Sequence, residues 1–177
     1  MKNKRPTIST GTGDLGTTAL LFGGNNKVNK TDVQVIASGD CDELNAAIGL
    51  AKAFSTNEQR KATLEAIQND LICLMADISC HPEHRKSLQD TMMIQTARIE
   101  WLEGLGVQLE QTAKPIKGWA LPGHNPESAA LDMARTVARR TERSMLNIPV
   151  GKRPTKNAGV YLNRLSDVLW LLARSAE

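Results

Sequence analysis

The sequence predicts an all-α fold, a five-helix up-and-down bundle in a ferritin-like arrangement, with an irregular segment at its N-terminus. Aromatic residues are only 3% of the chain, so the core must be built from Leu, Ile, Val, Ala and Met, which favours helices over a β-sandwich. Apolar residues recur at three- and four-residue spacing in five stretches separated by short breaks. A chain of 177 residues suits a single domain, with a leader at 1–38 and a helical bundle at 39–175.

The composition indicates a cytoplasmic protein without a nucleic-acid or membrane partner. The formal net charge of +3 is too small to indicate nucleic-acid binding by itself. No apolar run approaches the ~20 residues of a membrane-spanning helix, and the basic start MKNKR is not followed by the apolar stretch of a secretory signal. The three cysteines, Cys41, Cys73 and Cys80, contain no CxxC pair and are typical of reduced thiols.

The leader is rich in glycine, threonine and lysine. Residues 9–18 read STGTGDLGTT, and FGG at 22–24 and KVNKTD at 27–32 follow. Glycines let backbone N–H groups converge on an anion, while hydroxyls and lysines add donors and charge, so the leader suits a phosphate. It lacks the GxxxxGK order of a P-loop, and no βαβ unit surrounds it. Taken alone, however, a mobile leader without a ligand is the favoured interpretation of this segment.

The first helix is expected from Asp40 to about Phe54. Asp40 is a good N-cap, and Glu43, three residues later, completes a capping box. Asp42 lies off the apolar stripe, and capping does not explain it. The residues at core spacing are Cys41, Leu44, Ile48 and Ala51.

The second helix is expected over residues 57–80 and ends at the sequence CHPEH, residues 80–84. Pro82 disfavours helix for the residue before it. The cysteine and histidines there allow a metal-site interpretation. A second ligand cluster and zinc-finger spacing are missing, so an ordinary loop between helices is the favoured interpretation.

Three further helices complete the bundle. The third is expected over residues 88–109, and the fourth begins with Asn125 as N-cap and Pro126 at its first position. A basic, breaker-rich loop at 147–157 precedes the fifth helix, at 160–174.

The fourth helix carries the densest charge, in LDMARTVARRTER at 131–143. Arg135, Arg139 and Glu142 fall at i, i+4 and i+7 on one face, whereas an apolar stripe is expected from Ala130, Met133, Ala134 and Val137. This pattern suits an ion-pair network or an anionic ligand, but for a charge run taken alone a solvated surface is the favoured interpretation. Nucleic acid is disfavoured, because acidic residues interrupt the positive field and few aromatics are available for stacking.

Six segments, in order, carry a family resemblance. They are STGTGDLGTT, KVNKTD, GDCDELN at 39–45, LPG at 121–123, ARTVARRTER at 134–143 and YLNRLSD at 161–167. Over nearly the whole chain the sequence resembles the PduO-type ATP:cob(I)alamin adenosyltransferases.

The resemblance implies a homotrimer with active sites between neighbouring subunits. Cob(I)alamin attacks the 5′ carbon of ATP, giving adenosylcobalamin and triphosphate, with Mg²⁺ as a further cofactor. A reductase supplies cob(I)alamin, and an adenosylcobalamin-dependent client enzyme is a further partner. Because cobalt(I) is itself a strong nucleophile, the protein must mainly align the substrates, neutralise the triphosphate and exclude water.

The resemblance also assigns residues. The catalytic residues would be Arg135, Asp42, Trp119 and Arg139, with Arg135 paired to Asp42. Trp119 would contact cobalamin and help displace its lower axial ligand, although a hydrophobic plug against a helix is an equal alternative. Asn163 would contact ATP or help place Mg²⁺. The ATP-binding residues would be Thr10, Thr12, Gly13, Asp14, Gly16, Thr18, Lys30, Arg135, Arg139, Glu142 and Asn163.

Some positions depart from the family pattern. Gly11 stands where Lys or Arg is usual, which removes a charge-assisted contact worth ~1.5–3 kcal/mol, or roughly ten- to hundred-fold in ATP affinity unless another lysine substitutes. His124 replaces a glycine, Asp132 a histidine, and Ile36 and Ser38 a common Glu and Tyr. The expected protein is an active enzyme with weaker ATP binding. The alternative is a catalytically weakened paralogue that binds ATP or cobalamin as a sensor or delivery chaperone.

Overall fold

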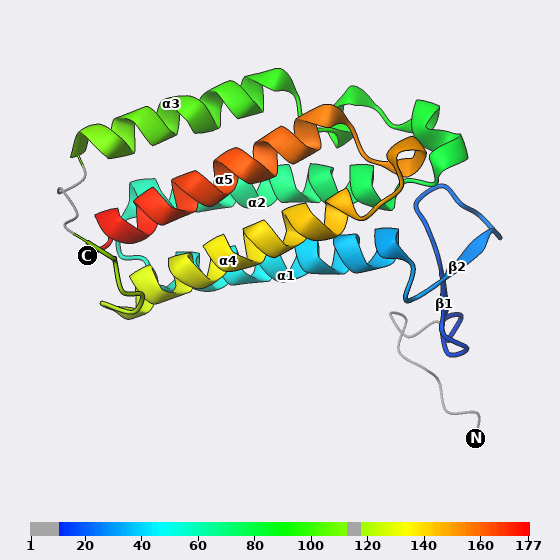
Figure 1. Cartoon of the computed structure of the whole chain (residues 1–177), viewed down its shortest axis with the longest axis horizontal. Coiled ribbons are helices and arrows are strands. Elements are labelled where there is room, and N and C mark those ends of the chain that lie inside the picture. The colour runs from blue at the N-terminus through cyan, green and yellow to red at the C-terminus, as the bar shows by residue number, and fades with distance from the viewer. Residues whose placement is uncertain (1–10, 113–117) are drawn as a thin grey trace.

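The structure, a computed structural model, describes residues 11–112 and 118–177, the side chain of Thr112 excepted, and these residues are mostly helical (Figure 1). The predicted five-helix bundle is confirmed. Its long helices are α1 Val33–Phe54, α2 Glu58–Ser79, α3 Thr96–Thr112, α4 Pro126–Leu146 and α5 Lys156–Ser175. Two strands, β1 Thr17–Ala19 and β2 Lys27–Asn29, and three short 3-10 turns, η1 Pro82–Ser87, η2 Asp90–Met92 and η3 Val150–Lys152, complete the described elements.

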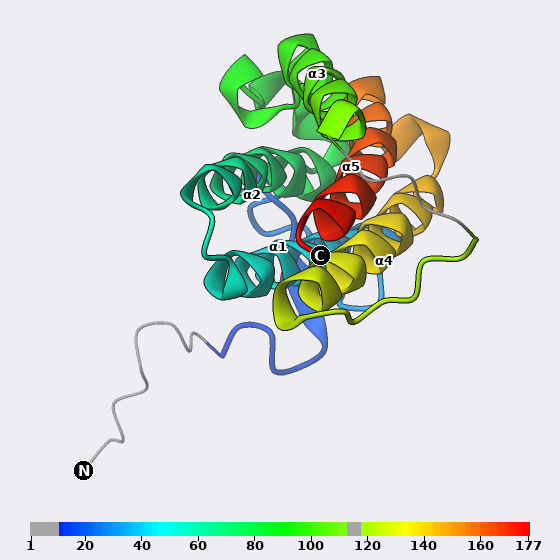
Figure 2. The ribbon, with the colours of Figure 1, turned by 90° about the vertical axis from the view of Figure 1, so that its left-hand side faces the viewer.

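All five long helices contribute to the core, and α3 adds Ile99 and Leu102 to it. α1 packs against both α2 and α4, α4 packs against α5, and α3 covers α5, as the end view in Figure 2 shows. The core is aliphatic apart from Tyr161, as the low aromatic content requires. None of the described helices is both long and apolar enough to span a membrane.

The start of α1 differs from the prediction. Asp32, not Asp40, is the N-cap, and its side chain accepts a hydrogen bond of 2.9 Å from the backbone N–H of Gln34. The helix therefore continues through Gly39, although an interior glycine costs about 1 kcal/mol relative to alanine. Asp40 lies inside the helix and contacts Arg140 and Ser144 of α4. Tertiary contacts thus occupy the carboxylate that the local pattern assigned to capping.

The leader contains a small hairpin that the sequence did not predict. β1 and β2 pair antiparallel, with Thr17 opposite Asn29. The chain after β1 is fixed to the end of α2, because Leu21 N–H donates to Ser79 O at 2.8 Å and His81 N–H donates to Leu21 O at 2.9 Å. A strand of three residues is too short to show an alternating pattern of polar and apolar residues in the sequence. A two-stranded hairpin is only marginally stable by itself, and the backbone hydrogen bonds to the end of α2 stabilise this one.

Three other predictions on helices need correction, and one is confirmed. α5 begins at Lys156 rather than near Val160, so it includes the end of the loop predicted at 147–157. α3 begins at Thr96 rather than near Leu88, because the 3-10 turns η1 and η2 occupy the intervening chain. Met133 is 60% exposed and does not belong to the apolar stripe of α4. The predicted start of α4 is confirmed, and Asn125 forms a capping box with Ser128.

Candidate functional site

The glycine-rich part of the leader folds into tight turns beside two lysines. Gly16 N–H donates to Gly13 O at 3.1 Å, and Lys30 N–H donates to Gly16 O at 2.9 Å. A Cβ added to Gly13 would lie 3.1 Å from Thr17 O and 3.2 Å from Lys30 Nζ, so a side chain there would push the ammonium group away from the loop. Lys27 Nζ donates to Thr12 O at 2.9 Å. Two positive charges therefore flank this loop, which suits a polyphosphate.

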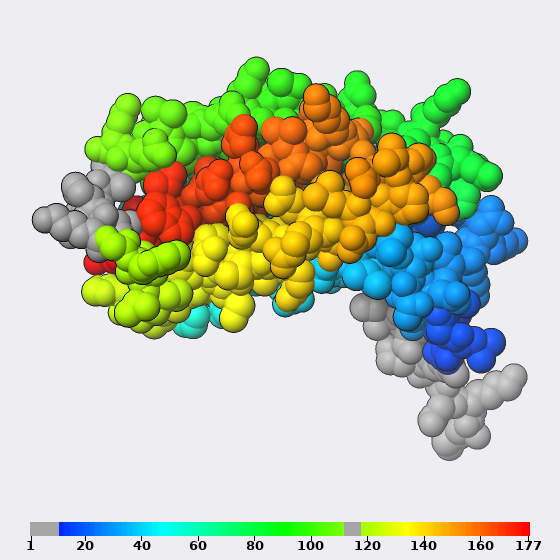
Figure 3. Space-filling model, viewed as in Figure 1, coloured from blue at the N-terminus to red at the C-terminus, as the bar shows by residue number. Residues whose placement is uncertain are grey.

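The predicted leader residues fall in this region, with one exception. Thr12, Gly13, Asp14 and Gly16 lie in the turns, and Thr18 lies on β1. Thr10 lies outside the described residues. Figure 3 shows the described part of the leader, in blue, at one end of the bundle, where α1 begins.

Asp42 and Thr18 line the same hollow. This hollow, of about 490 Å³, lies between β1, α1 and α2 and also includes Ala19, Leu20, Val35, Ser38, Gly39, Met75 and Ser79. Asp42 is exposed and makes no hydrogen bond or ion pair with another described residue. Among the described residues, no partner occupies this carboxylate at the edge of the hollow.

The thiol beside Asp42 is not a nucleophile. Burial, with the nearby charges of Asp42 and Asp40, raises the pKa of Cys41 to about 12. A thiol with that pKa is almost fully protonated at neutral pH, and only the thiolate is reactive.

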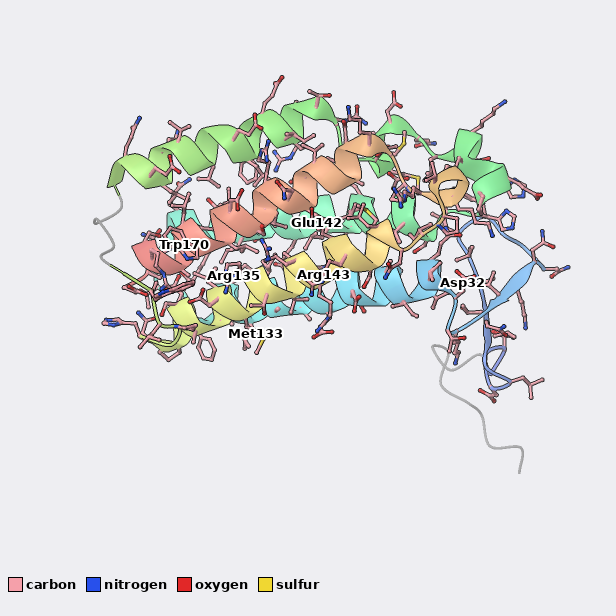
Figure 4. All side chains as sticks on the ribbon, in the orientation of Figure 1. Asp32, Met133, Arg135, Glu142, Arg143 and Trp170 are labelled. Atoms are coloured by element: carbon pink, nitrogen blue, oxygen red, sulfur yellow. The ribbon has the colours of Figure 1, made fainter. Side chains whose placement is uncertain are left out.

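The second group of predicted residues lies along α4 and α5. Arg135 is partly exposed and Arg139 is exposed. Glu142 Oε1 accepts a hydrogen bond of 3.4 Å from Asn163 Nδ2. Figure 4 shows Arg135 and Glu142 on the side of α4 toward α5, with Met133 on the other side. Two arginines, a carboxylate and an amide thus share one face, as the spacing predicted.

The predicted pair of Arg135 with Asp42 does not form within the chain. Arg135 Nε donates instead to Asp132 Oδ1 at 3.3 Å. Asp42 lies toward α2 on α1, whereas Arg135 lies toward α5 on α4, so the bundle separates them. The sequence motifs could not reveal this separation, because it depends on which side of each helix faces its neighbour.

Asp132 is a positioning residue that the sequence identified only as a departure. Its side chain is almost fully buried and also accepts a hydrogen bond from Arg174 Nη2 on α5. Asp132 therefore ties Arg135 to α5 and restricts where the guanidinium can point. An acid three residues before an arginine on a helix was the available sequence signal.

Trp119 projects from the segment before α4. It is 98% exposed, and Leu121 close by is also exposed. The interpretation of Trp119 as a hydrophobic plug against a helix is therefore wrong. An exposed tryptophan of this size can instead contact a large ligand.

The comparisons with known proteins agree with these features. The family model described as cobalamin adenosyltransferase matches residues 8–176. The chain belongs to the cobalamin adenosyltransferase family. The match includes all six motifs, so the resemblance stated from the sequence is confirmed.

Three known proteins illustrate the similarity. The chain is 35% identical over 170 residues to corrinoid adenosyltransferase PduO of Salmonella typhimurium, covering 96% of this chain but only 49% of that protein. It is 39% identical to a corrinoid adenosyltransferase of Mycobacterium leprae, covering 96% of this chain and 91% of that protein. A solved variant of the PduO-type ATP:corrinoid adenosyltransferase of Lactobacillus reuteri, complexed with cobalamin and ATP, matches with a TM-score of 0.86 and 30% identity, covering 96% and 92% of the two chains.

Proposed function

We propose that this adenosyltransferase-family chain transfers the 5′-deoxyadenosyl group of ATP to cob(I)alamin, giving adenosylcobalamin and triphosphate. The observation that carries the proposal is the glycine loop with Lys27 and Lys30 beside it, in a chain of this family. Two ammonium groups at such a loop would hold ATP and stabilise the charge of the leaving triphosphate.

The chemistry places few demands on side chains. The cobalt(I) of the corrinoid substrate supplies the electron pair for the new Co–C bond, and the C5′–O bond to triphosphate breaks. The protein aligns the two substrates and excludes water. This role agrees with a site built from arginines, lysines and glycine turns, in which Cys41 is protonated.

We further propose a homotrimer in which the two groups of site residues meet between copies. The hollow with Thr18 and Asp42 would come from one copy, and Arg135 and Arg139 from its neighbour. Asp42 would then pair with the neighbour's arginine. Support comes from exposed apolar residues along the outer side of α1 and α4, a surface that a second copy would cover; they are Ile36, Leu50, Phe54 and Met133.

We propose that Mg²⁺ binds at Glu142 and Asn163. Glu142 offers a carboxylate oxygen, and Asn163 would offer its Oδ1 in place of the 2.9 Å hydrogen bond that this atom accepts from Arg164 Nη1. Phosphate oxygens and water would complete the oxygen ligands that Mg²⁺ prefers. Bound there, the ion would neutralise charge on the triphosphate. In the same arrangement, the exposed ring of Trp119 would contact cobalamin.

The remaining expectations also stay proposals. A reductase would supply cob(I)alamin, and an adenosylcobalamin-dependent enzyme would use the product. Three free cysteines among the described residues favour a reducing compartment such as the cytoplasm. The leader and bundle would act as one domain, because backbone bonds of Leu21 and His81 join them.

The test is adenosylation of chemically reduced cobalamin by the full chain with MgATP. Light-sensitive adenosylcobalamin, formed faster than in a protein-free control, is the expected product. Its absence, with folded protein present, would contradict the proposal.

A second candidate function is binding without turnover, as a sensor or delivery chaperone. Gly11 and His124 favour it, because both depart from the family pattern. Saturable ATP binding without any adenosylcobalamin would support this function, whereas efficient turnover by the unmodified chain would eliminate it.

A further inference from the structure

Two histidines and a glutamate meet at the loop that follows α2. His81, Glu83 and His84 each offer one ligand atom, and these atoms all lie within 4.8 Å of one another. The two imidazole rings have centroids 5.4 Å apart. None of the three residues lines the hollow that contains Thr18 and Asp42.

The backbone brings these side chains together. His84 N–H donates to His81 O at 2.9 Å, which closes the first turn of the 3-10 helix η1. Side chains at i and i+3 eclipse each other in such a turn, so the two imidazoles face the same direction. Pro82 at the first position of η1 fixes the entry into the turn. The local sequence thus presets the spacing of the three ligands.

His81 has a buried nitrogen that the protein leaves unpaired. Its Nδ1 is inaccessible to solvent and has no hydrogen-bond partner among the described residues. Buried polar groups without a partner are rare, because each costs free energy that a hydrogen bond or a metal bond would recover. A loop without a ligand gains nothing from an unpaired buried nitrogen, so this atom favours a bound ligand at the loop.

The loop is held on both sides, so the cluster is preorganised. His81 N–H donates to Leu21 O, and a Cβ added to Gly23 would lie 3.5 Å from His81 Cδ2. On the other side, Arg85 Nη1 donates to Asp77 O at 3.2 Å and pairs with the Asp77 carboxylate. The positive charge nearest the cluster in sequence is therefore neutralised by a partner of its own.

We propose that His81, Glu83 and His84 bind one divalent transition-metal ion of the zinc class, with a fourth position open to water. Two imidazoles and one carboxylate are ligands typical of zinc and related ions, whereas Mg²⁺ and Ca²⁺ prefer oxygen alone. Cys80 is not part of the set, because its Sγ contacts His81 O. The ion stiffens the connection between α2 and the leader hairpin.

The first experiment measures zinc binding to the full chain, without a polyhistidine tag and after treatment with a chelator. The chain has three histidines, so His124, outside the cluster, provides a matched control. Calorimetric titration with ZnCl₂ is expected to show one saturable site in the wild type and in His124→Ala. His84→Ala is expected to weaken binding by roughly ten-fold or more, since losing even an outer-shell partner typically costs that much.

Several outcomes would overturn the proposal. They are no saturable binding in the wild type, equal binding by His84→Ala and the wild type, or equal loss in His124→Ala. His84 is exposed, so its substitution should leave the helical circular dichroism unchanged; if it does not, Glu83→Gln replaces it as the test variant.

A second measurement tests the ligand set and the connection to the leader. Co²⁺ in place of zinc should give weak visible bands without a sulfur charge-transfer band, and strong sulfur absorption would refute the ligand set. Zinc should also slow hydrogen exchange of the amides at 20–24 in the wild type but not in His84→Ala. Unchanged exchange on zinc binding would refute the stiffening of the leader.

Discussion

At the scale of single residues, the buried carboxylate of Asp132 positions the side chain of Arg135. It accepts hydrogen bonds from Arg135 on its own helix and from Arg174 on α5. Because Arg174 keeps the carboxylate paired, Arg135 can be released toward a ligand without leaving a buried charge alone. The guanidinium of Arg135 is therefore both positioned and available.

The first prediction concerns Arg135. Arg135→Ala should lower kcat/KM for adenosylation by roughly 100-fold, the usual effect of removing one group that stabilises developing charge. The free energy of unfolding should fall by less than ~1 kcal/mol, because Asp132 keeps Arg174. Arg143→Ala, an exposed arginine on the same helix, is the control and should retain activity. Full activity in Arg135→Ala would place the site on another face.

The second prediction concerns the charge missing at Gly11. Gly11 has a φ of 69°, a conformation that costs a side-chain-bearing residue about 1 kcal/mol, whereas Lys27 donates to the adjacent Thr12. We expect Lys27 to supply the missing charge. Lys27→Met should raise the KM for ATP by roughly ten-fold. Lys61→Met, which removes a lysine paired with Glu58 on α2, should not change it, and equal effects of the two variants would exclude this role.

At the scale of elements, α1 separates two roles of aspartate that sequence patterns confuse. Asp32 caps the helix, while Asp40 lies within it and joins it to Arg140 and Ser144. Asn caps a helix about as well as Asp but carries no charge. The two roles therefore predict different effects of the same substitution.

The third prediction uses this difference. Asp32→Asn should change the free energy of unfolding by less than ~0.5 kcal/mol, whereas Asp40→Asn should lower it by about 1–2 kcal/mol because Arg140 and Ser144 lose a charged acceptor. Urea unfolding followed by circular dichroism measures both. A larger loss of unfolding free energy in Asp32→Asn than in Asp40→Asn would contradict these two roles.

Most of the helical framework could be predicted, and its errors have a common cause. The start of α4 was correct because Asn125 and Pro126 act locally. The start of α1 was wrong because two acidic residues could cap it, and only packing against α4 distinguishes them. Met133 was assigned to the core because it continues an apolar pattern, but its side of α4 is exposed.

At the scale of the whole molecule, the predicted site divides into two groups that one chain does not unite. The leader and Asp42 lie on one side of the α1–α4 pair, and Arg135 and Glu142 lie on the other. In the proposed trimer, a second copy of the chain would bring the two groups together.

The fourth prediction tests this arrangement by complementation. Asp42→Asn and Arg135→Ala should each be nearly inactive alone. When both are co-expressed, mixed trimers should recover up to about a third of wild-type activity, because one of the three interfaces in each mixed trimer joins two intact halves. Purification through a different tag on each variant ensures mixed trimers. If mixed trimers gain no activity, the site does not lie between copies.

The sequence by itself determined the helical framework, the aliphatic core and the family, because each depends on local periodicity or on motifs read in order. It also placed Arg135, Arg139 and Glu142 on one face, since helical spacing alone fixes that relation. Only the tertiary structure decided which neighbour each face meets. It placed the N-cap of α1 at Asp32, kept Arg135 apart from Asp42, and joined the loop with His81 to the leader beside the hairpin. The physical reason is that burial and pairing depend on how helices rotate against one another, which is settled by contacts distant in the sequence.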